Sequence, residues 1–283
     1  MATTSSGYAA DFLPIVVALP APAVTTIERE LTYTHFTVLL DPARRFAVST
    51  GVNIDGSSPL DIDRTDDWHL DARIPASEQA GEDIYAANDL DRGHLVRRRD
   101  PVWGDQSTAA RANEETFVYT NAAPQAGHFN QGKELWSGLE DFVLAYARAY
   151  RQRISVFTGP VLHADDPPYR GIQIPRQFWK IATWTTAEGG RALAASGYVL
   201  DQTPQLDDID LAEARAAAVG EPPPLGPYRT YQVPISDIAE LTGLELGQLI
   251  AADRLATAPV PHGTTDDDHP GWVRLQSRDD IVL

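Results

Sequence analysis

The 283-residue sequence contains no cysteine, one methionine and only two lysines, Lys133 and Lys180. The absence of cysteine excludes disulfide bonds, thiolate zinc sites and a cysteine nucleophile. Any metal ion must therefore be bound by oxygen or nitrogen ligands. The other basic residues are all arginine, whose planar guanidinium suits bidentate contacts with phosphate. Genome composition or a salty habitat would produce the same bias toward arginine.

The sequence also lacks a long uninterrupted apolar run. The apolar stretch nearest the N-terminus, residues 12–24, is broken by three prolines, and no Lys or Arg precedes it. A secretory signal needs a positively charged start, and a membrane-spanning helix needs roughly 20 apolar residues. We therefore expect no membrane partner and no conventional signal peptide, so that the protein is cytoplasmic or exported by a non-classical route.

Positive charge is scarce in the whole chain, which has 23 basic and 40 acidic residues, a net charge of −17 and a pI of about 4.7. This balance argues against a protein that coats nucleic acid, because affinity for the phosphate backbone comes mainly from Lys and Arg. A local basic site remains compatible with it. The hydrophobic content of 43% is enough to build a sizeable core.

Apolar periodicity predicts a mixed fold. Residues 31–39 and 45–49 have the alternation of a β-hairpin, with its turn at Asp41-Pro42. Residues 57–115 are polar and predict long loops, and residues 116–120 predict a buried strand. Apolar residues recur at helical spacing between Lys133 and Arg153, which predicts a long amphipathic helix.

The segments after residue 153 predict further strands and helices. Strands are predicted over residues 154–162, 178–185 and 194–200, and helices over 209–219, 234–241 and 246–252. We expect an α+β domain in which a long helix packs on a central antiparallel sheet. The predicted organisation is an irregular N-terminal segment over 1–28, one folded domain over 29–258 and an acidic C-terminal tail over 259–283.

The segment Asp91-Arg92-Gly93-His94 is the first that suggests chemistry, and arginines follow it at positions 97, 98 and 99. A neutral imidazole can accept a proton from water near pH 7, because its unperturbed pKa is about 6.5. His94 is therefore a candidate general base beside charge that can bind phosphate. The same tetrapeptide is compatible with a salt bridge in a loop and an ordinary half-buried histidine.

A second group of polar residues follows in residues 120–132 and on the predicted long helix. The amide of Asn130 and the carboxylate of Glu140 are hard oxygen ligands, which suit Mg²⁺. Asn121 and Gln125 have side chains that can orient His94 or the backbone. The alternatives are turn chemistry for Asn121 and Gln125 and a solvent-facing helix position for Glu140.

The order of these motifs resembles a known family. Asp-Arg-Gly-His, then Thr-Asn-x-x-Pro-Gln, Asn-Gln-Gly, Trp and Leu-Glu is similar to the DNA/RNA non-specific endonucleases, the ββα-metal nucleases that include endonuclease G. Shorter matches at residues 33–36, 53–56, 159–161 and 178–180 extend the resemblance over roughly residues 30–250. Agreement at several separate motifs is far more specific than agreement at one.

The resemblance implies roles for individual residues. It implies that His94 is the general base, that Arg92 lies near the phosphate and that Asn130 is the direct ligand to Mg²⁺, with Mn²⁺ as an alternative. Glu140 and Asp91 are then carboxylates that bind waters of the metal ion, Glu140 also being counted as catalytic. The ββα-metal element would run from the His94 strand to the helix of Glu140. The implied substrates are DNA and RNA, the products carry 5′-phosphate, and family members often form homodimers.

The chain departs from the family pattern at two places. The catalytic arginine upstream of the histidine motif has two candidates here, Arg64 and Arg73, and we expect them, with Arg97 and Arg98, to contact substrate phosphate. The spacing between the Asn130 and Glu140 motifs is also longer, by residues 133–135, than in secreted members. Two other functions remain open: a non-catalytic nucleic-acid or protein-binding module on the same fold, and a phosphodiesterase of small nucleotides, which the acidic surface favours.

Overall fold

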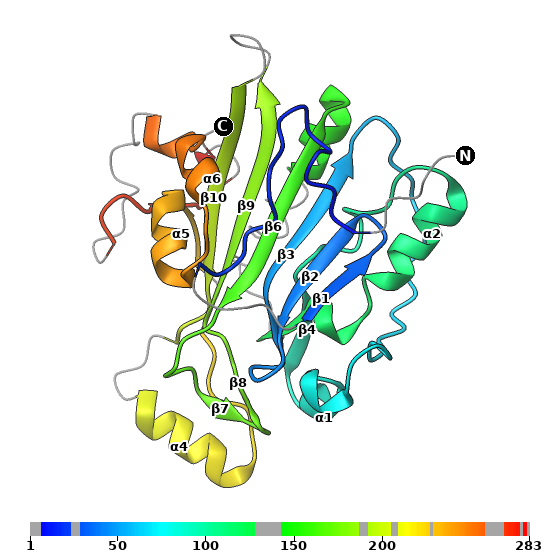
Figure 1. The fold of residues 1–283 in the computed structure, drawn as a ribbon. Coiled ribbons are helices and arrows are strands. Elements are labelled where there is room, and N and C mark those ends of the chain that lie inside the picture. The colour runs from blue at the N-terminus through cyan, green and yellow to red at the C-terminus, as the bar shows by residue number, and fades with distance from the viewer. Residues whose placement is uncertain are drawn as a thin grey trace.

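A computed structural model describes residues 7–23, 29–127, 143–186, 192–204, 209–226, 229–257, 269–277 and 280–281 of the chain. An eight-stranded antiparallel sheet forms the centre of this described part (Figure 1). In spatial order its strands are β1 (Arg29–Tyr33), β2 (Phe36–Asp41), β3 (Phe46–Asp55), β6 (Arg153–Val161), β9 (Gln177–Thr186), β10 (Ala192–Asp201), β11 (Arg229–Val233) and β12 (Val273–Arg274).

The alternation of side chains along each strand gives the sheet two buried faces. On β9, Trp179 and Ile181 point to one face, which is covered by α5 (Ile235–Thr242), α6 (Gly247–Ala251) and the N-terminal residues 7–23. Phe178 and Ala182 point to the opposite face, which packs against the segment that carries His94. The sheet is therefore a scaffold, and its second face holds the candidate site.

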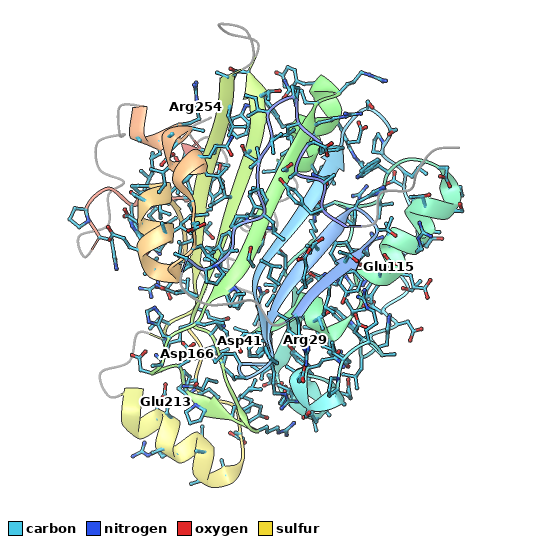
Figure 2. The ribbon with its side chains drawn as sticks, in the orientation of Figure 1. Arg29, Asp41, Glu115, Asp166, Glu213 and Arg254 are labelled. Atoms are coloured by element: carbon cyan, nitrogen blue, oxygen red, sulfur yellow. The ribbon has the colours of Figure 1, made fainter. Side chains whose placement is uncertain are left out.

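That segment is an insertion over residues 56–152, between the adjacent strands β3 and β6. It contains η1 (Ala76–Glu78), α1 (Glu82–Tyr85), β4 (Leu90–His94), α2 (Gln106–Glu115), η2 (Tyr119–Asn121) and β5 (Ala122–Ala126). The N–H of Thr34, in the turn between β1 and β2, donates to the carboxylate of Glu115 at 2.5 Å, which ties the end of α2 to the sheet (Figure 2).

The insertion returns to the sheet through a helix, of which residues 143–150 are described. A Cβ atom on Gly56, at the end of β3, would lie 1.9 Å from the carbonyl oxygen of Ala147 in that helix. Only glycine fits this approach, so the helix packs directly on the end of β3. The predicted helix over 133–153 is confirmed for residues 143–150, and residues 133–142 lie outside the described residues.

Two smaller excursions leave the sheet. The connection from β6 to β9 carries the short hairpin β7 (Pro168–Tyr169) and β8 (Ile172–Gln173), and the connection from β10 to β11 carries α4 (Ile209–Val219). Arg176 forms a salt bridge with Glu213 of α4 (labelled in Figure 2), which fastens α4 to the start of β9. The η3 turn (Leu255–Thr257) follows α6.

Three predicted elements differ from the structure. The strand over 31–39 is two strands, because Thr34 and His35 form a turn in which His35 has φ of 67°. Residues 57–115 include β4 and the ten-residue helix α2, which is capped by Asp105 and buries mainly alanine and polar side chains, so its apolar periodicity is weak. Residues 116–120 form turns that lead into η2, and the strand follows at 122–126.

The α+β class and the central antiparallel sheet are confirmed. The domain limits stay a prediction, but residues on both sides of them join the core: Leu13 and Val17 pack under α5, and Trp272 and Val273 are buried, with Val273 in β12. No helix in the described ranges is long and apolar enough to cross a bilayer.

Candidate active site

Strands β4 and β5 form a two-stranded antiparallel ribbon that presents His94 at the end of β4. His94 pairs with Ala122, and Asp91 pairs with Gln125. Leu90 and Ala123 belong to the core cluster on the face of the sheet that α5 and α6 leave uncovered. Apolar side chains on one side of the ribbon thus anchor it, and the histidine position follows from the strand register.

Gly93 allows the ribbon to close tightly. A Cβ atom at this position would lie 2.2 Å from Cδ of Gln125, whose side chain lies against the glycine. Gln125 is itself buried. We predicted a supporting role for Gln125, and its side chain packs against Gly93, the residue next to His94.

Asn121 fixes the loop that follows His94. Its Oδ1 accepts from the N–H of Val96 at 2.8 Å, and its Nδ2 donates to the carbonyls of Val96 and Thr116 at 2.9 and 3.0 Å. The N–H of Leu95 also donates to the carbonyl of Asn121 at 2.9 Å. Asn121 was expected to orient either His94 or the backbone, and the structure shows that its side chain bonds to the backbone.

Aromatic rings enclose the imidazole of His94. The ring of Trp68 lies 4.6 Å from it and the ring of Phe117 lies 5.2 Å away, edge to face. Nε2 of His94 is buried and has no hydrogen-bond partner among the described residues. Burial, followed by the positive charge of Arg64, lowers the pKa of His94 to about 3. The imidazole is therefore neutral at physiological pH.

Arg92 is held beside the ribbon by three side chains. It donates to Glu82 at 2.5 Å, and the hydroxyl of Tyr119 donates to the same carboxylate oxygen at 2.6 Å. The guanidinium carbon lies 5.6 Å from the ring centre of Tyr85. Sequence reasoning did not find Glu82, because no motif marks a residue at the start of a four-residue helix.

The two candidates for the upstream arginine lie in different places. Arg64 approaches the ring of Phe117, at 5.7 Å, so it shares that ring with His94, and it pairs bidentately with Asp66 at 2.6 and 2.5 Å. Arg73 pairs with Asp71 and donates to the carbonyl of Thr32 on β1. Arg64 is therefore the candidate near His94.

The arginines after His94 have different surroundings. Arg98 donates to the carbonyl of Ile62 at 2.7 Å and to Oδ1 of Asn113 at 2.9 Å, which braces the 61–63 segment against α2. Arg99 forms a salt bridge with Asp61. Arg97 is half-buried beside them.

The predicted metal ligands Asn130 and Glu140 lie outside the described residues. Asn130 follows the end of β5 by four positions in the sequence. Asp91 is half-buried on β4. Within the described ranges, no group of three or more His, Asp or Glu side chains could hold a metal ion. The metal site therefore stays a prediction.

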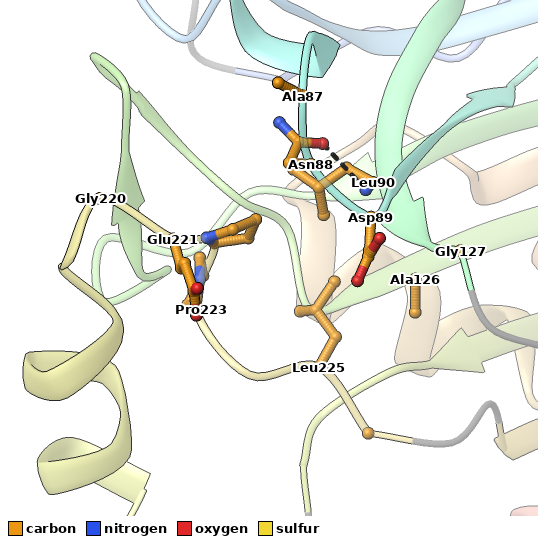
Figure 3. A pocket seen from close by; sticks show the side chains of 12 residues that line it. Ala87, Asn88, Asp89, Leu90, Ala126, Gly127, Gly220, Glu221, Pro223 and Leu225 are labelled. Carbon is orange, nitrogen blue, oxygen red and sulfur yellow. Dashed lines mark hydrogen bonds between the residues drawn. The ribbon is translucent and has the colours of Figure 1, made fainter.

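A pocket of about 460 Å³ opens at the other end of the ribbon, between Leu90, Ala126 and residues 220–226 (Figure 3). It is separated from His94 by the length of β4, roughly 13 Å at the usual rise of a strand. The side chains of Asp89 and Glu221 line it. These carboxylates disfavour phosphate, so we do not place the scissile phosphate there.

Trp68, Phe117 and Asp66 are further site residues that sequence reasoning missed. Of these three, only Trp68 has a recognisable sequence feature, because a large aromatic residue within a polar segment usually packs against other side chains. Phe117 was assigned to a strand, and its contact with His94 depends on the turn that the structure places there.

Comparison with known proteins agrees with this architecture. The β4–β5 ribbon and the helical residues 143–150 follow each other in ββα order, with Asp-Arg-Gly-His on the first strand. The sequence pattern of the family described as DNA/RNA non-specific endonuclease matches residues 20–253. The chain belongs to this family.

The alignments with individual relatives cover only part of each relative's length. An uncharacterised protein of Sinorhizobium fredii, y4fB, is 37% identical over 93% of the chain and 43% of its own length. Mitochondrial endonuclease G of Bos taurus is 28% identical over 63% of the chain and 54% of its own length, and a nuclease of Syncephalastrum racemosum is 27% identical over 52% and 49%. The chain thus spans about half the length of these relatives.

A solved structure has the same fold. A chain in the crystal structure of an EndoG/EndoGI complex, whose title concerns the mechanism of EndoG inhibition, superposes with a TM-score of 0.57 at 20% identity, covering 80% of this chain and 88% of that one. The recognition of the family from its motifs is confirmed.

Proposed function

We propose that this chain is a divalent-metal-dependent endonuclease that hydrolyses phosphodiester bonds of DNA and RNA. The observation that carries the proposal is the neutral imidazole of His94, which has a buried nitrogen without a hydrogen-bond partner among the described residues and lies close to Arg64. A base beside phosphate-binding charge is what phosphodiester hydrolysis requires. Membership of a family described as DNA/RNA non-specific endonuclease supports the same conclusion.

In this proposal His94 removes a proton from water, and the resulting oxygen attacks phosphorus. Trp68 and Phe117 restrict the orientation of the imidazole. A bond forms between the water oxygen and phosphorus, and the bond from phosphorus to O3′ breaks. The products then carry a 5′-phosphate and a 3′-hydroxyl.

Arg64 and Arg92 stabilise the negative charge that grows on the phosphate oxygens. Both guanidinium groups are paired with carboxylates in the free protein, Arg64 with Asp66 and Arg92 with Glu82. Their remaining N–H donors can contact phosphate, because a guanidinium carries five donors and each pair uses one or two.

Asn130 would hold the divalent ion directly, and Glu140 and Asp91 would bind its waters. An amide and carboxylates form an oxygen donor set, which fits Mg²⁺ and also accepts Mn²⁺. The ion supplies Lewis acidity at the phosphate when it is bound. Contacts to phosphate and metal carry no base information, so we expect cleavage of both DNA and RNA with weak sequence preference.

The test is an assay of supercoiled plasmid, single-stranded DNA and RNA with Mg²⁺, with Mn²⁺ and with chelator. We expect internal cleavage of all three substrates that chelator abolishes, and products that can be ligated because they carry 5′-phosphate. Cleavage of dinucleotides alone would indicate a phosphodiesterase of small nucleotides. Binding of nucleic acid without cleavage under every condition would indicate a non-catalytic module.

A further inference from the structure

One group of arginines gathers in the insertion of a chain whose net charge is −17: Arg64, Arg97, Arg98, Arg99 and Arg148. Burial and then the charges of Arg99, Arg64 and Arg97 lower the pKa of Arg98, which shows that these groups share one region. Arg148, on the helix over 143–150, joins them through Asp61. Concentrated positive charge in an acidic protein is unfavourable unless anions offset it.

Asp61 offsets part of this charge from an exposed position. Its carboxylate forms a salt bridge with Arg99 and lies 3.7 Å from Nη2 of Arg148. The carboxylate side chain is 76% exposed, whereas the side chains of Arg99 and Arg148 are 35% and 27% exposed. The two guanidinium groups are thus held by the fold, and the anion between them sits on the solvent side.

We propose that Arg99 and Arg148 form a second phosphate-binding site, for a backbone phosphate of nucleic acid flanking the scissile one, and that Asp61 occupies this site in the free protein. The inference rests on the proposed function and adds to it a longer substrate track. In this inference Asp61 competes with the substrate phosphate for Arg99 and Arg148.

The exchange of Asp61 for phosphate is physically easy. Exposed ion pairs contribute little to stability, and a phosphate offers more oxygen acceptors to a guanidinium than a carboxylate does. Nε of Arg148 is buried without a hydrogen-bond partner among the described residues, so this guanidinium has a donor left to satisfy. Asp61 contrasts here with Glu82, which the Tyr119 hydroxyl also holds in place.

The second site is connected to the first through Arg98. Arg98 contributes to the electrostatic environment of both His94 and Asp61, and it holds the carbonyl of Ile62, next to Asp61. A strand whose scissile phosphate lies between His94 and Arg64 can therefore continue toward Arg99. A dinucleotide has a single internucleotide phosphate and cannot fill both sites, so the second site distinguishes long substrates from short ones.

The experiment compares Asp61→Asn with the matched control Asp63→Asn in the full-length chain. Asp63 lies in the same segment, and within the described ranges its side chain forms no salt bridge with an arginine. Both variants therefore remove one negative charge, but only Asp61→Asn removes a salt bridge. Binding is measured by fluorescence anisotropy in chelator, with labelled DNA and RNA strands of about a dozen nucleotides and with a labelled dinucleotide. Melting temperatures are recorded for every variant.

We expect Asp61→Asn to bind the long strands about two- to fivefold more tightly, the range that corresponds to an exposed ion pair. Its affinity for the dinucleotide, and the affinity of Asp63→Asn for either probe, should equal that of the wild type. Arg148→Gln should weaken long-strand binding and reduce the slope of log K against log salt by about 0.7.

Equal affinities of Asp61→Asn and Asp63→Asn for long strands would overturn the inference, and so would a wild type that binds no strand. A lower melting temperature for Asp61→Asn with unchanged affinity would identify Asp61 as a structural brace. If the long strands bind through Arg99 and Arg148 but the plasmid is never cleaved, the proposed function fails and the second phosphate site stands.

Discussion

The chemistry of the candidate site depends on keeping one imidazole neutral. The ring of His94 lies against those of Trp68 and Phe117, and its Nε2 is buried. A charged imidazolium would be poorly solvated there, which is why the pKa falls. The surroundings that desolvate the ring thus keep the imidazole neutral.

Replacement of His94 tests its role as the base. We expect His94→Ala to lower the turnover of plasmid cleavage by about 10²–10⁴-fold, the usual contribution of general-base catalysis. His69→Ala is the matched control, because His69 is exposed and its imidazole bonds to the nearby carbonyl of Asp67. Rates are measured at saturating substrate. A His94→Ala variant that keeps more than about a tenth of the wild-type rate would remove His94 from the mechanism.

Glu82 is a second single residue whose role can be tested, because it positions Arg92. Because the Arg92–Glu82 pair is exposed, we expect Glu82→Gln to lower kcat/KM modestly, by about 2–10-fold. The loss should disappear when Arg92 is already alanine, which a double-mutant cycle measures. Asp83→Asn, in the same short helix, serves as the control for charge. A loss of equal size in both backgrounds would mean that Glu82 acts independently of Arg92.

At the scale of elements, the β4–β5 ribbon determines where the site residues lie. Its register places His94 at the strand end and Gly93 opposite Ala123. The side chain of Gln125 lies against Gly93, and Asn121 comes just before β5. The side chains of Asn121 and Gln125 contact the ribbon and the loop after it, so they support the strand that carries His94.

Gly93→Ala tests this packing. The new methyl group would meet the side chain of Gln125 at 2.2 Å, so we expect a loss of stability of about 1–3 kcal/mol from overpacking together with lower activity. The double variant with Gln125→Ala should regain most of that stability, since it removes the obstructing atoms. Chemical denaturation of both variants measures the effect. Failure of the second change to restore stability would show that the β4 backbone itself cannot accept alanine.

Sequence patterns predicted the elements whose signal is local. The strands β6, β9 and β10 were found because they are continuous apolar runs, and His94 was found because its motif is contiguous. Helix α2 was missed because it buries mainly alanine and polar residues. Glu82, Phe117 and Asp61 could not be assigned, because their contacts join parts of the insertion that no periodicity relates.

At the scale of the whole molecule, titration of two partly buried histidines links stability to pH. The pKa of His94 is lowered to about 3, and burial also lowers the pKa of His35. In the unfolded chain both groups titrate near about 6.5. Their neutral forms therefore contribute stability that is complete above that pH and is lost progressively as the pH falls toward the folded pKa.

The corresponding prediction concerns thermal unfolding between about pH 7.5 and pH 5, the interval in which unfolded histidine becomes charged. We expect the wild-type melting temperature to fall over this interval. The melting temperature of His94→Gln should fall less, since glutamine takes up no proton. Titration of His35 should account for part of the decline that remains. Differential scanning calorimetry at the two pH values provides the comparison. Parallel curves for the two proteins would contradict the pKa assigned to His94.

The position of the insertion between β3 and β6 has a kinetic consequence. These two strands are neighbours in the sheet, but residues 56–152 separate them in the chain, so their pairing must close a loop of roughly one hundred residues. The hairpins β1–β2–β3 and β9–β10 need only local contacts. We expect them to form early in folding, and the ribbon that carries His94 to settle only after the two halves of the sheet have met. The proposed active site of a newly made chain would then be completed at the last stage of folding.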